Sequence, residues 1–247
     1  MNRAGSAAML WLLLAGLTGC AALRPPPPPT VEAEAAWAAV RDFNQGIRTL
    51  KGSGTAELIR DETRQVGRAV WVGKAPAHLR VSLLDPVGRP ISTLVTDGEI
   101  LAARPGPENN GFRVHSPNPS LKSALGIPIR AREAIRLLAG RVPAVAPRGI
   151  VLEGDRLILT DRWNRRILAV ELDAEGERPV AVERYASGER QYRAVLKTGE
   201  AGPEGIRTLD RLTLLSADES ARFDLRVDRF WTNQSLPSRA FALEAPE

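Results

Sequence analysis

The chain has 247 residues, a formal net charge of +5, two histidines and a single cysteine. This length permits one large domain with a sizeable core. A single cysteine excludes a disulfide framework within the chain, and the shortage of histidine and cysteine argues against zinc sites and Cys-His catalysis. Only four of the 34 basic residues are lysines, and the arginines are spread along the sequence. The charge therefore predicts a solvated basic surface rather than a nucleic-acid site.

Residues 1–19 have the layout of a secretory signal. Arg3 supplies a positive charge and residues 7–16 supply a short apolar core, too short for the roughly 20 apolar residues that span a bilayer. This core ends in LTGC, residues 17–20, which resembles the bacterial lipobox. The resemblance implies cleavage before Cys20, after its sulfur has received diacylglycerol. The alternatives are an ordinary signal peptide with an incidental cysteine and an uncleaved anchor.

Residues 20–29 are expected to form a lipid-bearing tether. Several acyl chains on one residue anchor a protein almost irreversibly, because each buried methylene contributes about 0.8 kcal/mol. In the lipoproteins that LTGC resembles, Asp directly after the cysteine favours retention in the inner membrane. Ala21 stands there, which points to the periplasmic face of the outer membrane. The prolines at 25–29 predict a stiff polyproline II spacer, and a tail left over from processing makes the same structural prediction.

From residue 30 to residue 247 the pattern predicts one α+β domain. Thr30 can cap a helix in which Trp37, Val40 and Phe43 recur at helical spacing. Alternating apolar residues then predict about ten strands, at 56–58, 66–72, 79–83, 92–94, 157–159, 167–172, 181–185, 192–196, 209–214 and 223–231. Two short helices, at 121–125 and 131–138, interrupt them. Glycine among short polar residues at 173–176 and 186–189 predicts hairpins, and therefore antiparallel neighbours.

The sequence contains no recognisable catalytic constellation. The motifs H-E-x-x-H, C-x-x-C and G-x-S-x-G are absent. GRAVWVGK, residues 67–74, has one residue too many for a phosphate loop and lies in an alternating strand, whose amides the sheet uses. The carboxylate pairs at 61–62 and 218–219 fall in polar turns. We therefore expect no enzymatic activity, no metal site and no cofactor.

The segment LRVSLLDPVGRPISTLVT, residues 79–96, places a turn between two alternating strands. Asp85 and Pro86 suit the first positions of a turn, and Gly88 suits a position with unusual backbone angles. Val87 is unexpected, because a β-branched apolar residue at a hairpin tip cannot easily fold back into the core. Packing of Val87 against a neighbouring loop is the alternative.

Taken in order, several segments resemble the LolB-type outer-membrane lipoprotein receptors. They are the lipobox, the first helix leading into KGSGTAEL, LLDPVG, ALGIPIRAREAIRLLAG, YASGERQYRAVL and ARFDLRVDRFW. The likeness covers most of residues 30–231. It implies a half-open, curved antiparallel sheet or barrel of about ten or eleven strands, with a helical lid over an apolar cavity. It also implies a receptor that takes acylated lipoproteins from a soluble periplasmic carrier and inserts them into the outer membrane.

The resemblance also implies roles for individual residues. Family members project an apolar residue, commonly Leu, from the matching hairpin to perturb the membrane, and Val87 stands at that position within residues 85–88. Inward-facing residues would receive the acyl chains: Trp71, Leu79, Val81, Leu83, Phe223, Leu225 and Val227. Strand parity gives two faces, so plain core is the alternative for this set.

Transfer would need no nucleotide if each acceptor bound the acyl chains more tightly than its donor. The expected partners are the periplasmic carrier, the acylated cargo and outer-membrane lipid, and we expect the receptor to be a monomer. An envelope lipoprotein of the same fold that acts as a sensor or assembly subunit is the alternative function.

Overall fold

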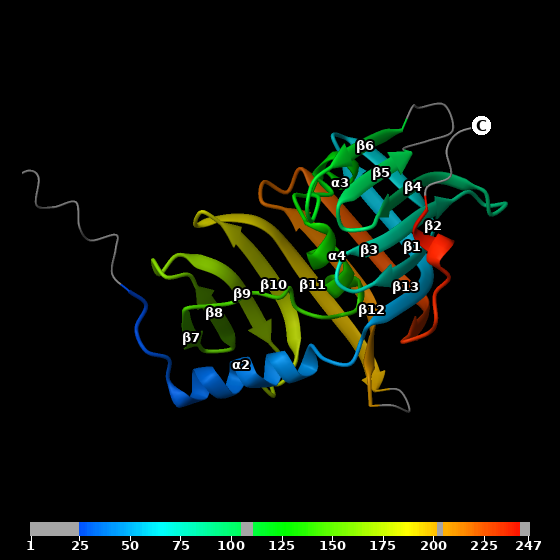
Figure 1. Cartoon of the computed structure of the whole chain (residues 1–247). Helices are drawn as coiled ribbons and strands as arrows, with labels where there is room; N and C mark the ends of the chain where they lie inside the picture. Colours follow the sequence, from blue (N-terminus) through cyan, green and yellow to red (C-terminus); the bar gives the residue numbers. More distant parts are fainter. Residues whose placement is uncertain (1–24, 105–110, 202–204, 243–247) are drawn as a thin grey trace, which may run out of the picture.

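The computed structural model describes residues 25–104, 111–201 and 205–242. In this part of the chain thirteen strands form one antiparallel sheet with the order β6-β5-β4-β3-β2-β1-β13-β12-β11-β10-β9-β8-β7 (Figure 1). The strands are β1 (Thr49–Arg60), β2 (Thr63–Lys74), β3 (His78–Leu84), β4 (Pro90–Thr96), β5 (Ile100–Arg104), β6 (Phe112–His115), β7 (Gly149–Glu153), β8 (Arg156–Thr160), β9 (Arg166–Leu172), β10 (Pro179–Ala186), β11 (Glu189–Ala201), β12 (Arg207–Ser216) and β13 (Ala221–Thr232). The helices are α2 (Val31–Phe43), α3 (Lys122–Leu125), α4 (Ala131–Leu138) and the 3₁₀ helix η2 (Ser238–Phe241). None of the helices in the described ranges is long and apolar enough to cross a membrane.

Two meanders make up the sheet. Strands β1–β6 form one and β7–β13 form the other, since each strand within them pairs with its neighbours in sequence. The meanders join where β1 runs antiparallel to β13, with Leu50 opposite Thr232 and Arg60 opposite Ala221. The first and last strands therefore lie side by side in the middle of the sheet (Figure 1).

The predicted strand count and the half-open barrel are wrong for this chain. The sheet has thirteen strands instead of ten or eleven, and its edge strands β6 and β7 do not pair with each other, so the described sheet stays open. The strands that sequence alternation missed are β5, β6 and β7, which have only five, four and five residues. Such short segments hold few positions in which a period of two can stand out, although β8, also of five residues, was predicted at 157–159. The domain is mainly one antiparallel sheet, with α-helices of only 13, 4 and 8 residues.

Helix α2 begins at the predicted cap. Thr30 Oγ1 accepts a hydrogen bond of 3.2 Å from the backbone amide of Ala33, which satisfies one of the free donors at the helix start. Ala33, Trp37 and Val40 are buried and pack toward β7 and β8. The helix therefore covers the β7 end of the sheet (Figure 1).

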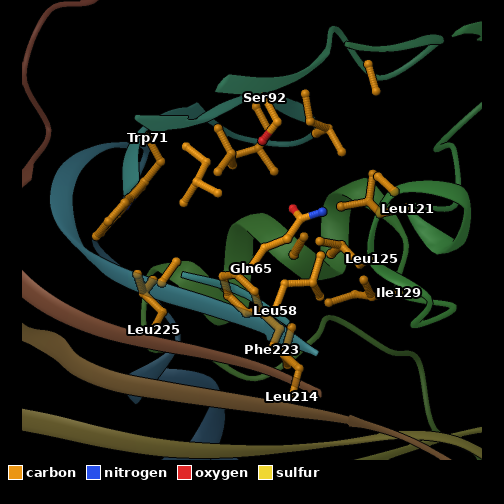
Figure 2. Close-up of a pocket in the computed structure, with 18 of the residues that line it drawn as sticks. Leu58, Gln65, Trp71, Ser92, Leu121, Leu125, Ile129, Leu214, Phe223 and Leu225 are labelled. Atoms are coloured by element: carbon orange, nitrogen blue, oxygen red, sulfur yellow. The ribbon is translucent and has the colours of Figure 1, made fainter. Parts of the chain in front are cut away.

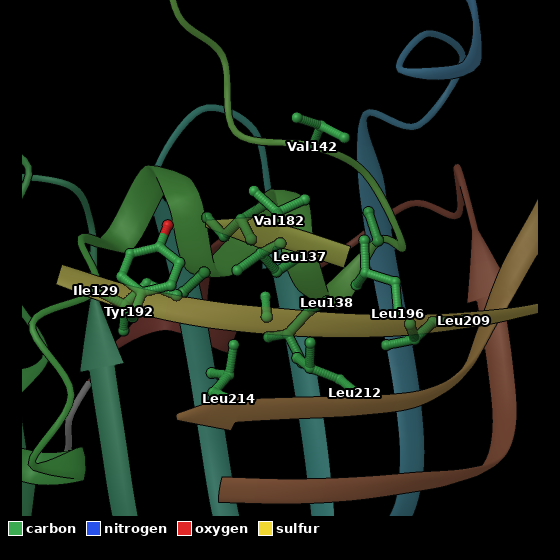
Figure 3. Close-up of a cluster of buried hydrophobic side chains, with 14 of the residues drawn as sticks. Ile129, Leu137, Leu138, Val142, Val182, Tyr192, Leu196, Leu209, Leu212 and Leu214 are labelled. Atoms are coloured by element: carbon green, nitrogen blue, oxygen red, sulfur yellow. The ribbon is translucent and has the colours of Figure 1, made fainter. Parts of the chain in front are cut away.

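Helix α4 is fixed to the sheet by packing. Its buried residues are Ala131, Ala134, Ile135, Leu137 and Leu138. Figure 3 shows Leu137 and Leu138 beside the strand residues Leu196, Leu212 and Leu214, and all of them belong to one hydrophobic core. Burial of a leucine side chain contributes about 1.5–3 kcal/mol. Helix α3, by contrast, contains no buried residue.

Candidate functional site: an apolar cavity and an exposed hairpin

An apolar cavity of about 320 Å³ lies between the sheet and the helices α3 and α4 (Figure 2). Strands β1–β6, β12 and β13 form its walls. Its apolar lining consists of Ala56, Leu58, Trp71, Leu79, Val81, Leu83, Leu94, Ala103, Phe112, Leu121, Ala124, Leu125, Ile129, Ala134, Leu137, Leu138, Leu212, Leu214, Phe223 and Leu225. Ligand pockets commonly measure about 300–1,000 Å³, so this one has the size and lining for an apolar ligand.

Six of the seven side chains predicted to face acyl chains line this cavity. They are Trp71, Leu79, Val81, Leu83, Phe223 and Leu225. The seventh, Val227 on β13, lies opposite Gly54 of β1. It packs against the hydrophobic core, outside the cavity lining. Trp71, Leu79 and Leu225 are also buried members of the core, so cavity wall and core are continuous at this face.

Sequence reasoning missed much of the remaining lining. Ala56 and Leu58 on β1, and Leu212 and Leu214 on β12, lie at every second position, as do the residues predicted on β3 and β13. The same alternation, followed through every strand, would have found them. The contribution of α3 and α4 could not be found in this way, because helical spacing does not show which part of a sheet a helix covers.

Trp71 is positioned by a glycine. Gly52 lies opposite Trp71 in the ladder between β1 and β2, and a Cβ atom on Gly52 would clash with Cζ2 of the indole. The missing side chain lets the indole lie across β1, where the Phe230 ring packs at a centroid distance of 6.5 Å. Trp71 Nε1 is buried and has no hydrogen-bond partner among the described residues.

The polar part of the lining lies at the end of the sheet that carries the β1–β2 and β3–β4 turns. It consists of Arg60, Thr63, Gln65, Ser92, Thr93, Arg104 and Ser123. Arg60 and Thr63 pair beside the β1–β2 turn, and Leu83, the partner of Ser92, precedes the β3–β4 turn. Figure 2 shows the Gln65 amide among the apolar side chains. The cavity is therefore apolar at the Trp71 end and polar at the turn end.

The two cavity helices are held in different ways. Arg60 Nη1 donates hydrogen bonds to the carbonyl oxygens of Ser123 at 3.1 Å and Ala124 at 3.3 Å, both in α3. Helix α4 is held by its buried residues and by an ion pair of 2.7 Å between Glu133 and Arg184 of β10. Helix α3 is therefore the more weakly attached of the two.

The turn at residues 85–89 is stabilised by its own carboxylate. Asp85 Oδ1 accepts hydrogen bonds from the amides of Val87 at 3.0 Å and Arg89 at 2.8 Å, and Oδ2 accepts one of 2.9 Å from Arg89 Nε. The amide and guanidinium of Arg89 hold the pKa of the Asp85 carboxyl below its usual range. Gly88 adopts φ +88°, which suits glycine, and Pro86 lies between Asp85 and Val87. Val87 is 76% exposed, so packing against a neighbouring loop does not account for it.

The proposed lipidation site, Cys20, lies outside the described residues. The described part of the tether begins at Pro25. A Cβ atom on Gly149 would clash with Pro26, so the tether lies against the start of β7. Gly149 pairs with Thr160 at the end of β8. The tether therefore joins the domain at the β7–β8 edge of the sheet.

Other features of the described chain offer less chemistry. A second hollow is lined by Lys51, Arg68, Arg80 and Arg229 together with apolar residues that include Trp231, whose ring lies 5.5 Å from Lys51 Nζ. Among the described residues, no group of three or more His, Cys, Asp or Glu side chains could hold a metal ion.

Comparisons with known proteins support the fold. No family model and no curated protein matches this chain. A LolA superfamily protein from Nitrosomonas europaea matches with a TM-score of 0.55 and 14% identity, over 85% of this chain and 97% of that one. A DUF1329 family protein from Desulfovibrio piger matches with a TM-score of 0.57 and 9% identity, over 86% and 98% of the two chains.

A domain from Vibrio parahaemolyticus, described as that of an outer-membrane lipoprotein-sorting protein, matches with a TM-score of 0.52 and 11% identity. The match covers 85% of this chain and 95% of that one. At these identities the likeness concerns the fold alone. The fold of this chain is therefore similar to the folds of these three proteins, one of which is a LolA superfamily protein.

Proposed function

We propose that this protein is an outer-membrane lipoprotein receptor that accepts acylated lipoproteins from a periplasmic carrier and inserts them into the membrane. The observation that carries the proposal is the cavity under α3 and α4, whose lining is apolar except at one end. Acyl chains offer no directional bonding groups, and an apolar cavity binds them by removing their surface from water. The LolA-type fold, shared with a domain described as lipoprotein-sorting, supports the same role.

Cys20 supplies the membrane attachment in this proposal. The apolar core that precedes LTGC directs export, and acylation of the cysteine anchors the mature chain. Ala21 favours the outer membrane, so in this proposal the domain works at the periplasmic face of that membrane. The proposed receptor is a monomer. Transfer runs down a gradient of affinity for the acyl chains and requires no catalysis and no nucleotide.

Cargo entry requires a change in the cover of the cavity. A volume of about 320 Å³ lies near the small end of ligand pockets, and a cargo with several acyl chains needs more room. Helix α3 is the weakly attached part of the cover, so its displacement costs the least free energy. The hydrogen bonds from Arg60 to α3 lie at the same end of the sheet as the turn with Val87. Displacement of α3 would therefore open the cavity beside the hairpin that contacts lipid in this proposal.

A transfer assay tests the proposal. The chain from residue 20 onward, with Cys20→Ala, is mixed with a carrier loaded with an acylated lipoprotein, and we expect the cargo to move to it. Failure to accept any cargo would contradict the proposal.

Val87→Glu separates the receptor from a sensor or assembly subunit of the same fold. A receptor with this change still loads cargo but releases it poorly into vesicles, because a carboxylate resists entry into lipid. Val195→Glu is the matched control, since Val195 is 39% exposed but lies inside β11, between β10 and β12. Unchanged release by the Val87 variant would favour the sensor or assembly role.

A further inference from the structure

The turn between β8 and β9 repeats the construction of the turn that carries Val87. Asp161 Oδ1 accepts hydrogen bonds from the amides of Trp163 at 2.9 Å and Arg165 at 3.0 Å, and Oδ2 accepts one of 2.8 Å from Arg165 Nε. Asn164 adopts φ +59° where the other turn has its glycine. Both turns fix an apolar side chain at the third position, which is Val87 in one and Trp163 in the other.

Two cations lie close to the ring of Trp163. The guanidinium carbons of Arg162 and Arg165 lie 3.7 Å and 4.6 Å from the centre of its ring, and the residue is still 37% exposed. Arg165 forms an ion pair with Asp161, whereas no described carboxylate pairs with Arg162. An indole flanked by arginines suits the interface between membrane and water, where the ring lies among headgroups and the cations attract anionic lipid.

The surroundings of the turn add to its positive charge. Arg148 and Arg166 are exposed beside it: Arg148 donates its amide to the carbonyl of Thr160, and Arg166 begins β9. With Arg162 and Arg165, four arginines accompany the single carboxylate of the turn. This excess of charge complements an anionic bilayer surface.

The tether leaves the domain at the same place. Pro26 lies against Gly149, which pairs with Thr160, the residue directly before the turn. Cys20 precedes Pro26 by six residues, which span at most about 21 Å when fully extended. A lipid on Cys20 therefore keeps Trp163 near the membrane. In Figure 1 the β8–β9 turn and the start of the described chain lie on the same side of the molecule.

We propose that the turn at residues 161–165 is a second membrane contact, in which Trp163 enters the headgroup region and the arginines bind the phosphates of anionic phospholipids. The inference rests on the acylation of Cys20 in the proposed function. The contact holds the β7–β8 edge of the tethered domain on the bilayer. It is separate from the turn with Val87, which joins β3 to β4 near the other edge of the sheet.

Quenching of tryptophan emission by lipid tests the contact. The mature acylated protein is reconstituted into vesicles of phosphatidylcholine with about 30% phosphatidylglycerol, in which the acyl chains carry bromine close to the headgroup. We expect Trp163→Phe to remove the quenchable part of the emission. Trp231→Phe is the matched control, because Trp231 is 36% exposed but lies near the end of β13, at the opposite end of the sheet. Equal quenching in wild type and Trp163→Phe would overturn the proposal.

The arginine contribution is measured with Arg162→Gln, which leaves the bonds within the turn intact. We expect this change to lower the ratio of docked to undocked domain roughly fivefold on anionic vesicles and to have little effect on neutral ones. An equal effect on both kinds of vesicle would contradict the phosphate contact. The cargo-transfer assay is independent: transfer without quenching of Trp163 overturns only this inference, and quenching without transfer overturns only the proposed function.

Discussion

The guanidinium of Arg60, at the end of β1, donates a hydrogen bond of 3.1 Å to the carbonyl oxygen of Ser123 in α3. The same nitrogen donates a second bond of 3.3 Å to Ala124. Since α3 contains no fully buried residue, these bonds act beside the buried N-cap residue Leu121 and the partly buried Ala124 and Leu125 in holding it over the cavity. Arg60 is therefore a direct link from the sheet to the α3 part of the cavity cover.

Arg60→Ala should make α3 open more often. The two bonds from a charged donor contribute about 1.5 kcal/mol, so the hydrogen-exchange protection of the amides of Leu125 and Gly126 should fall about tenfold. The amide of Ala139 at the end of α4 should keep its protection, because packing and an ion pair fix that helix. Arg64→Ala is the control, since the Arg64 side chain is 65% exposed and its ion pair within the described residues is with Glu57. Equal loss of protection in both helices would show that Arg60 supports the whole domain instead.

Gly52→Ala should displace Trp71 and reduce the space in the cavity. The added Cβ would clash with the indole, and relief of such overpacking costs about 1–3 kcal/mol. We expect a lower free energy of unfolding in chemical denaturation and weaker binding of a fluorescent fatty acid. In a double-mutant cycle, Trp71→Leu should remove most of the cost of Gly52→Ala, because leucine lacks the clashing atoms. If the costs of Gly52→Ala and Trp71→Leu in the free energy of unfolding simply add, Gly52 is needed for the backbone conformation of β1 and not for the space around Trp71.

Glu183→Gln should destabilise the β8–β11 part of the sheet. Glu183 is 7% exposed, accepts a hydrogen bond of 2.7 Å from the hydroxyl of Tyr185, and pairs with Arg156 and Arg193. Loss of the charge leaves Arg156 without a carboxylate partner among the described residues, while Arg193 keeps Glu171, at a cost of about 2 kcal/mol in the free energy of unfolding. Glu175→Gln, with a side chain that is 63% exposed, should change it by less than about 0.5 kcal/mol.

The cost of Glu183→Gln should also depend on pH. Burial raises the pKa of Glu183. The hydrogen bond from the Tyr185 hydroxyl and the charges of the two arginines lower it by more, so the net change in the pKa is downward from 4.5. A carboxyl with a lowered pKa adds stability above its unfolded pKa and loses it as pH falls through its folded pKa. Denaturation curves should therefore show the difference between wild type and variant shrinking below about pH 4.5. A constant difference across that range would contradict the ionic role.

Val87→Leu should speed the release of cargo into vesicles. The change adds one methylene at an exposed tip, which contributes about 0.8 kcal/mol on entering lipid, or about fourfold in rate if the tip enters before release. Val87→Thr keeps the shape of the side chain and adds a hydroxyl, so it should slow release. Identical rates for the three proteins would show that the tip does not enter lipid.

Local signals in the sequence predicted those parts of the structure that depend on near neighbours. Thr30 caps its helix, and Asp85 with Gly88 forms its turn, because each of these features is complete within five residues. Trp163 gave no comparable signal, since its turn uses Asn164 in place of glycine. Arg60 gave none either, because it bonds to backbone carbonyls, which every residue possesses.

The order of the strands could not be predicted from local patterns. Alternation identifies a strand and its two faces but not its partner, and the pairing of β1 with β13 joins residues far apart in sequence. The position of α3 and α4 over β1–β6 depends on the same long-range arrangement. For this reason the sequence identified six cavity residues on strands but did not show where the polar end would lie.

The pairing of β1 with β13 also has a consequence for the order of assembly in time. The meander of β1–β6 can form early, but the free side of β1 stays an unpaired edge until the last strand arrives. Unpaired edges invite pairing with other chains, and contacts between distant segments form slowly. Until β13 has formed, a newly synthesised chain would therefore expose the future centre of its sheet as an unpaired edge. Protection by a folding helper would matter most before residue 221 is available.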